Sequence, residues 1–133
     1  MPVPTIGRVF LLFLGVAVLA VTAGHRSSGR ESEISVRQQV TPQPVRVGPA
    51  TITIQIADAA QKPVSPATIT VEADMSHPGM GPVFAEAEET APGSYQAHIG
   101  FNMGGDWVVL LHIKLPNGRK IERQIDVRGV QSN

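Results

Sequence analysis

The stretch that decides the fold of this chain is Trp107-Val108-Val109-Leu110-Leu111-His112-Ile113-Lys114-Leu115. Every second residue in it, from the tryptophan onward, is large and apolar, and a period of two is typical of a β-strand that buries one face. A Pro-Asn-Gly sequence follows directly, and its Asn-Gly pair suits the positive φ of a hairpin turn. The stretch therefore predicts the most apolar strand of the chain, central in its sheet and turned back through a hairpin.

The same alternation recurs along the chain, and prolines and glycines separate the alternating segments. From Ile34 onward no segment carries a convincing helical period. About seven short strands with turns at this spacing predict an all-β fold, an antiparallel β-sandwich. The residues expected to face its core are Ile34, Val36 and Val40; Ile52, Ile54 and Ile56; Ile69, Val71, Ala73 and Met75; Tyr95, Ala97, Ile99 and Phe101; and Ile121, Ile125 and Val127.

Residues 83–90 form the weakest of the predicted strands, because their alternation is poor and acidic residues interrupt it. Glu86, Glu88 and Glu89 are expected to be solvated. Charged side chains of this kind discourage the pairing of a sheet edge with another chain. The segment therefore predicts a single acidic edge strand.

Composition limits the possible functions. The chain has 133 residues, a formal net charge of zero and no cysteine. Neutrality gives no indication of nucleic-acid binding. The absence of cysteine excludes disulfides, thiolate zinc sites and cysteine nucleophiles. The sequence also lacks a nucleophile elbow and a glycine-rich phosphate loop. We therefore expect a protein that is not an enzyme and whose fold depends on its hydrophobic core alone.

The amino-terminal segment predicts export. Arg8 precedes an uncharged apolar run from residue 9 to residue 21, and small residues suited to signal peptidase follow it. Residues 1–23 are thus a signal peptide or a helical membrane anchor, and the run itself leaves both alternatives open. Residues 24–33 are polar and form a linker, residues 34–128 the sandwich domain, and residues 129–133 a tail. The expected location is extracytoplasmic, in the periplasm or cell envelope, with membrane contact only through the first segment.

The methionines mark the candidate site. Apart from the initiator, the chain has three, and they lie in two turn-like segments, Met75-Ser76-His77-Pro78-Gly79-Met80 and Asn102-Met103-Gly104-Gly105-Asp106-Trp107. Two chain reversals separate these segments. Short connections between antiparallel neighbours therefore return the chain to the same end of the sandwich.

Met75, His77, Met80 and Met103 together predict a soft metal site. Thioether sulfur is a soft, neutral ligand and imidazole a borderline one, so the set suits copper as Cu(I) better than a hard cation. The alternative is packing. Methionine fills irregular gaps and contacts aromatic rings well, so these side chains could instead cover the core near Trp107, with His77 solvated.

Four segments carry a resemblance to a known family, the YtkA-like domain family, which is related to FixH-type proteins. The resemblance spans about residues 34–127. The family's methionine-rich turn, its Gly-x-Tyr strand start and its Met-x-Gly-x-Trp step are matched at Met75 and Met80, at Gly93 and Tyr95, and at Met103, Gly105 and Trp107. The fourth segment is Pro44-Val45-Arg46-Val47-Gly48.

The resemblance implies an immunoglobulin-like sandwich outside the cytoplasmic membrane. It also implies an association with copper handling, cytochrome oxidase maturation or metal efflux. Two functions follow as expectations. One is a copper-binding module that works with a membrane complex such as an oxidase or efflux assembly. The other is a metal-free accessory domain that docks on such a complex.

Overall fold

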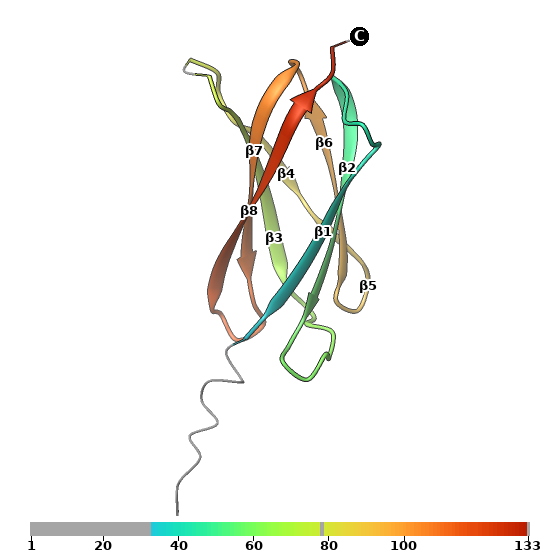
Figure 1. The fold of residues 1–133 in the computed structure, drawn as a ribbon. Helices are drawn as coiled ribbons and strands as arrows, with labels where there is room; N and C mark the ends of the chain where they lie inside the picture. Colours follow the sequence, from blue (N-terminus) through green and yellow to red (C-terminus); the bar gives the residue numbers. More distant parts are fainter. Residues whose placement is uncertain (1–32, 78, 133) are drawn as a thin grey trace, which may run out of the picture.

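The computed structural model describes residues 33–77 and 79–132, and two four-stranded antiparallel sheets account for most of them (Figure 1). No helix occurs among these residues. The strands are β1 (Ser35–Thr41), β2 (Gly48–Ala57), β3 (Thr68–Met75), β4 (Val83–Glu86), β5 (Glu88–Ala91), β6 (Ser94–Phe101), β7 (Gly105–Lys114) and β8 (Lys120–Val130).

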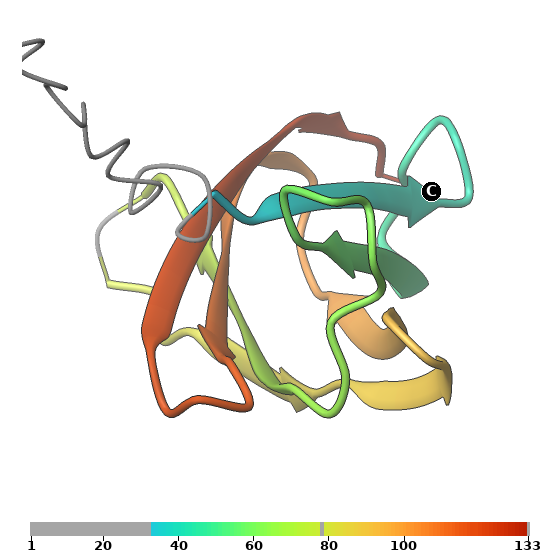
Figure 2. The same ribbon diagram turned by 90° about the horizontal axis from the view of Figure 1, so that it is seen from below.

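The two sheets face each other, which Figure 2 shows in a view along the strands. One sheet has the order β1-β2-β6-β5 and the other the order β4-β3-β7-β8. The predicted immunoglobulin-like β-sandwich is therefore confirmed. The strand that begins near Trp107 is β7, an inner strand of its sheet, and it joins β8 through the expected hairpin, in which Gly118 has a φ of 85°.

The core consists of the inward side chains of both sheets, and their alternation is the one expected from the sequence. Among the described residues, no polar or charged residue is buried. The rings of Phe101 and Trp107 meet edge to face, with centroids 5.2 Å apart. The largest fully buried side chains are those of Trp107, Tyr95, Phe101, Ile52, Ile54, Ile56, Ile69, Leu111, Ile113, Val71 and Val109.

The acidic segment 83–90 differs from its expected form, because it is two strands in two sheets. β4 pairs with β3, whereas β5 pairs with β6. The change occurs at Ala87, whose N–H still donates to the carbonyl of Ile69 at 3.0 Å before the chain crosses to the other sheet. The sandwich thus has eight strands rather than about seven. Both short strands are sheet edges, and their glutamates are exposed as expected.

The sandwich has two ends with different contents. The methionine pole, as we call it, is the end formed by residues 75–77, 79–82 and 102–106. The opposite pole carries the start of β1, the end of β2, the β5–β6 turn and the β7–β8 hairpin (Figure 1). The first described residues thus enter the domain at the end farthest from the methionines.

Tyr95 fixes the long β2–β3 connection at the opposite pole. Its hydroxyl donates to the carbonyl of Val64 at 2.8 Å and accepts from the N–H of Ala67 at 3.0 Å. Gly93 has a φ of 78°, and a Cβ atom there would lie 2.6 Å from the Cβ of Pro63. Glycine is therefore required by both backbone conformation and close approach. The Gly-x-Tyr step holds the 58–67 loop against the sheet.

The predicted leader, residues 1–23, lies outside the described residues, as does most of the 24–33 linker. In the part of the chain that the structure describes, no helix is long and apolar enough to cross a membrane.

Replacement of Tyr95 by phenylalanine should destabilise the domain while leaving the sandwich intact. The substitution keeps the ring but removes the partner of the Ala67 N–H. A donor left without a partner costs about 1–3 kcal/mol. Urea unfolding measures the change in the free energy of unfolding, and circular dichroism checks that the β signal is retained. A variant as stable as the parent protein would show that the hydroxyl does not hold the loop.

Alkaline titration should weaken the fold through the same residue. Burial raises the pKa of Tyr95 above its ordinary value of 10.0, so the folded state holds the phenolic proton more tightly than the unfolded chain does. Stability must then fall as the pH rises through 10.0. Because the chain has one tyrosine, absorbance reports its ionisation directly. Tyr95→Phe should remove this component of the alkaline destabilisation.

Candidate metal centre

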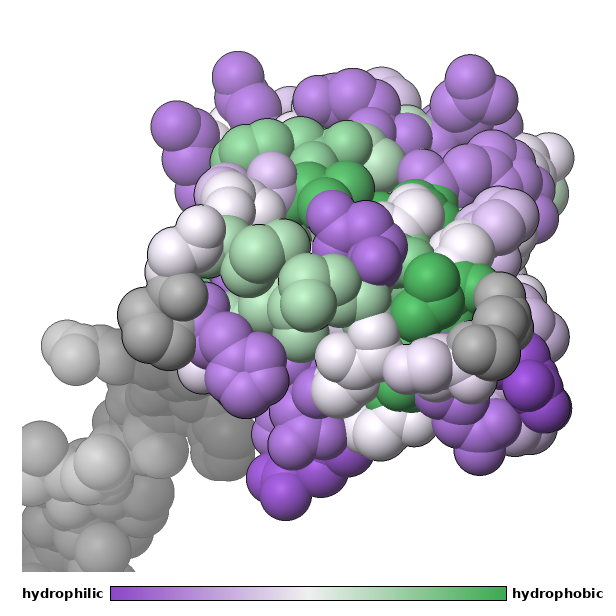
Figure 3. Space-filling model, turned by 90° about the horizontal axis from the view of Figure 1, so that it is seen from above, coloured by the Kyte–Doolittle hydropathy of each residue, from purple (hydrophilic) through white to green (hydrophobic). Residues whose placement is uncertain are grey.

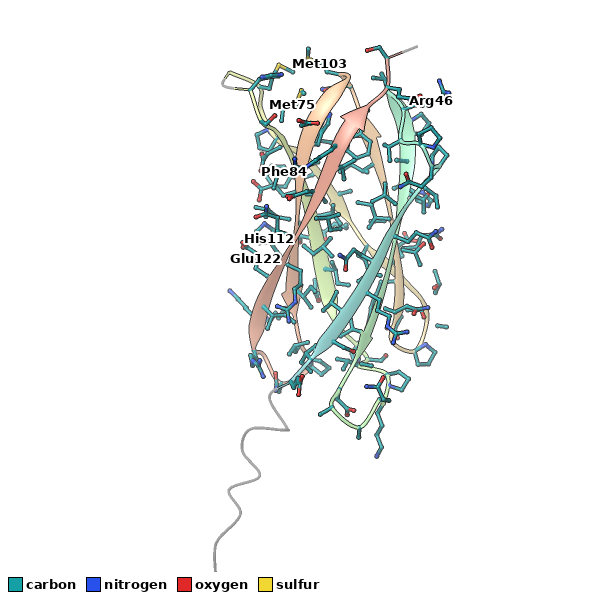
Figure 4. The ribbon with its side chains drawn as sticks, in the orientation of Figure 1. Arg46, Met75, Phe84, Met103, His112 and Glu122 are labelled. Carbon is teal, nitrogen blue, oxygen red and sulfur yellow. The ribbon has the colours of Figure 1, made fainter. Side chains whose placement is uncertain are left out.

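Hydrogen bonds join the two turns that carry the methionines. The backbone N–H and the hydroxyl of Ser76 both donate to the carbonyl of Asp106, at 3.3 Å and 3.1 Å. The indole N–H of Trp107 donates to the carbonyl of Met103 at 3.0 Å. The topological expectation that these segments share one end of the sandwich is therefore confirmed, and Figure 4 shows Met75 and Met103 at that end.

Met75 is the most enclosed of the four predicted ligands. It ends β3 on the inward side, is only 9% exposed, and lies opposite Trp107 in the β3–β7 register. Its methyl carbon lies 3.5 Å from the position that a Cβ on Gly105 would take. Gly105 has a φ of 118°, which favours glycine, and it therefore places no side chain beside the Met75 thioether. Met75 thus completes the core and borders the surface of the pole.

The other three predicted ligands are exposed. Met80 is 39% exposed and Met103 is 44% exposed, both unusual values for large apolar side chains, and His77 is exposed as well. Figure 3 looks onto this pole, where a central group of hydrophobic residues is surrounded by hydrophilic ones. Among the described residues, the hydrogen bonds that link the two turns involve neither His77 nor Met80. Met75 and Met103 lie on segments fixed together, and the four-residue ligand set stays a prediction.

A third segment, which no sequence pattern predicted, reaches the same pole. The carboxylate of Asp106 accepts from the N–H of Gly129 at 2.8 Å. A Cβ on Gly104 would lie 2.5 Å from the hydroxyl oxygen of Ser132 and 3.0 Å from the carbonyl of Val130. The end of β8 therefore packs on the 102–106 turn and braces it, which is a reason for the glycine pair in that turn.

The donor set is consistent with a soft metal. Within residues 33–77 and 79–132, no cluster of three or more His, Cys, Asp or Glu side chains is arranged to hold a metal ion. What the pole offers is neutral sulfur with one imidazole, which is the chemistry that Cu(I) prefers.

His112 makes contacts that the sequence did not predict. Its ring lies between two carboxylates on the strands that flank β7. Nε2 lies 2.7 Å from Glu72 of β3, and Nδ1 lies 3.1 Å from Glu122 of β8. Only the cross-strand register brings these residues together, since Glu72 and His112 are 40 positions apart. His98, by contrast, is exposed, and its Nδ1 lies 3.2 Å from the Thr51 hydroxyl.

Comparison with protein families gives one match. The family described as YtkA-like matches residues 31–112, which include β1 to β6, the methionine-rich turn and most of β7. Comparison with curated proteins gives no significant match.

Solved structures provide neighbours at low sequence identity. The C-terminal domain of ZirS has a TM-score of 0.51 at 16% identity and covers 98% of this chain and 83% of its own, which shows a shared fold alone. The soluble domain of PmoD from Methylocystis sp. ATCC 49242 (Rockwell) has a TM-score of 0.48 at 11% identity, with coverage of 74% and 90%. Murine CRIg has a TM-score of 0.42 at 10% identity, with coverage of 76% and 98%.

Truncation of Trp107 should greatly lower the free energy of unfolding of the domain. Trp107 is 2% exposed, contacts Phe101 and binds the Met103 carbonyl, so Trp107→Ala should cost about 3–5 kcal/mol. Phe84→Ala is the control, because Phe84 is 61% exposed and its truncation should change stability by less than about 0.5 kcal/mol. Denaturant unfolding measures both. Equal effects would mean that the indole does not support the pole.

Proposed function

This chain belongs to the YtkA-like family, and from that premise we propose that it is an exported copper-handling module that binds Cu(I) at the methionine pole. Its leader either releases it after cleavage or tethers it to the cytoplasmic membrane. The copper that it binds serves a membrane complex such as an oxidase or a metal efflux assembly. The protein carries the metal and performs no catalysis.

One observation carries this proposal: all three interior methionines lie at one end of the sandwich, Met75 at the end of β3 and Met80 and Met103 on the turns, and His77 follows Met75 by two positions in the sequence. Methionine that serves only packing would be expected within strands that face the core. Met80 and Met103 instead lie outside the strands and are partly exposed, which costs stability because exposed apolar area is not buried on folding.

Each ligand would have a distinct part. Met75 is held by the core and would give a fixed thioether at the base of the pole, beside Gly105. Met103 sits on a turn braced by Trp107 and Asp106. Met80 and His77 lie on the loop after β3, which follows Ser76, the residue bound to Asp106. A bound Cu(I) ion would receive soft, neutral ligands from this set and no carboxylate.

A second candidate function is a metal-free accessory domain that docks on a membrane complex. Met75 favours it, because this residue is buried and already has a structural role against Trp107. The indole bond to Met103 likewise stabilises the turn without any metal.

Replacement of the exposed methionines separates the two functions. Met80→Leu and Met103→Leu should each weaken Cu(I) binding by about tenfold or more, because leucine has no donor atom. Leucine keeps the apolar volume, so stability should change by less than about 1.5 kcal/mol. Competition of the purified protein with a Cu(I) chelator measures the affinity, and fluorescence of the single tryptophan monitors the pole during the titration.

A pair of histidine variants supplies the matched control. His77→Gln should weaken Cu(I) binding, whereas His98→Gln, which changes an exposed histidine on β6, should leave the affinity unchanged. Unchanged affinity in the Met80→Leu, Met103→Leu double variant would overturn the copper site and leave the metal-free docking domain as the function.

A further inference from the structure

The outer face of the β4-β3-β7-β8 sheet has an unusual composition for a solvent-facing surface. Phe84, on the edge strand β4, is 61% exposed, the most of any large apolar side chain among the described residues. Val108 and Leu110 also point outward from the inner strand β7 and are half-buried. A sheet face that only meets water usually alternates to polar residues at such positions.

Cross-strand register places these apolar residues among carboxylates. Phe84 lies opposite Glu72, which in turn lies opposite Leu110. The row on one side contains Glu86, Thr70, His112 and Glu122, and the row on the other contains Asp74, Val108 and Asp126. Figure 4 shows Phe84, His112 and Glu122 in descending order below the methionine pole. We call this surface the acidic face; its carboxylates are Glu72, Asp74, Glu86, Glu122 and Asp126.

The negative charge of the acidic face is only partly balanced. His112 contacts both Glu72 and Glu122, and Arg128 lies 4.0 Å from Asp126, whereas the contact that Glu86 makes within the described residues is with the neutral Thr70 hydroxyl at 3.2 Å. Desolvation and repulsion from Glu72 raise the pKa of Asp74. Two carboxylates that repel each other in this way are stabilised by a cation brought between or over them.

We propose that the acidic face docks a cationic segment of a partner protein, a stretch with lysine or arginine side chains around one apolar residue. The apolar residue packs on Phe84 and Leu110, and the cations meet Glu72, Asp74 and Glu86. An exposed aromatic residue ringed by complementary charges has the composition of an interface anchor with a polar rim. The proposal does not depend on copper, because none of these contacts involves the thioethers.

Charge also argues against other occupants. An anionic membrane surface and nucleic acid are both repelled by the five carboxylates. A second copy of this chain would bring two acidic faces together, which is unfavourable for like charges. Lys114 and Lys120 lie opposite each other in the β7–β8 register toward the opposite pole, and they mark the limit of the acidic face on that side.

The test uses the purified full-length protein without metal and a short peptide probe in which lysines flank a single leucine. Two matched peptides serve as comparisons, one with the leucine replaced by glycine and one with glutamates in place of the lysines. Backbone amide shifts should change on β3, β4 and β7 with the first peptide, less with the second and not at all with the third. Affinity should fall as the salt concentration rises.

Variants assign the binding to the acidic face. Phe84→Ala should weaken binding of the probe about tenfold, a size typical of an interface anchor. Glu86→Gln should weaken it about two- to threefold at low salt and reduce its salt dependence. Glu33→Gln is the control, since it makes the same charge change at an exposed residue before β1 at the opposite pole. Thermal unfolding checks that each variant is folded.

Several outcomes would overturn the proposal. Amide shifts scattered over both sheets, or an equal loss of binding in Glu33→Gln and Glu86→Gln, would mean that the peptide follows only general charge. Binding to anionic phosphatidylglycerol vesicles through Phe84 would point to a membrane surface. A dimer in sedimentation equilibrium that Phe84→Ala dissociates would make a second copy the occupant. None of these results bears on copper affinity, so the docking surface and the metal site can fail separately.

Discussion

The alternation of inward apolar side chains is the constraint on which this molecule depends. With no disulfide available and no buried polar or charged residue among the described residues, burial of apolar side chains between the sheets is what holds them together. Residues such as Ile52, Val71 and Leu111 must therefore be apolar, because their positions in the strands face the core. The residue type is less constrained at the turns and at the outward positions of the strands. The side chains proposed to bind metal or a partner lie there, apart from Met75: thioethers at one end, and carboxylates with Phe84 on one face.

The same constraint explains how far sequence reasoning reached. Period-two patterns give the strands, the β7–β8 hairpin and the burial of Trp107, because they report local environment. The change of sheet at Ala87 was missed because β4 and β5 are short edge strands. Their exposed glutamates do not alternate with buried residues, so the sequence does not show which side of each strand faces the core. The contacts of His112 with Glu72 and Glu122 were missed because they depend on register between strands far apart in the chain. Chain reversals predicted that Met75 and Met103 share a pole, whereas the approach of Met80 and His77 depends on loop conformation, which no pattern encodes.

The two proposed surfaces lie side by side along one strand. Asp74 faces outward on β3 and belongs to the acidic face, and the next residue, Met75, faces inward at the base of the methionine pole. Phe84 lies on β4, the strand that follows the loop carrying Met80. A partner held on the acidic face would thus sit next to the thioethers, an arrangement suited to passing a metal between two proteins without release to solvent.

The entry of the chain at the opposite pole also sets a reach. β1 starts at that pole, and the longest strand, β8, has 11 residues and runs from that pole to the methionines. At about 3.3 Å per residue it spans roughly 35 Å. If the leader stays in the bilayer, an upright sandwich acts as a spacer that holds its sulfur ligands up to about that length from the end at which the chain enters. A tethered form would then most readily meet acceptors whose own extracytoplasmic parts rise to a similar height.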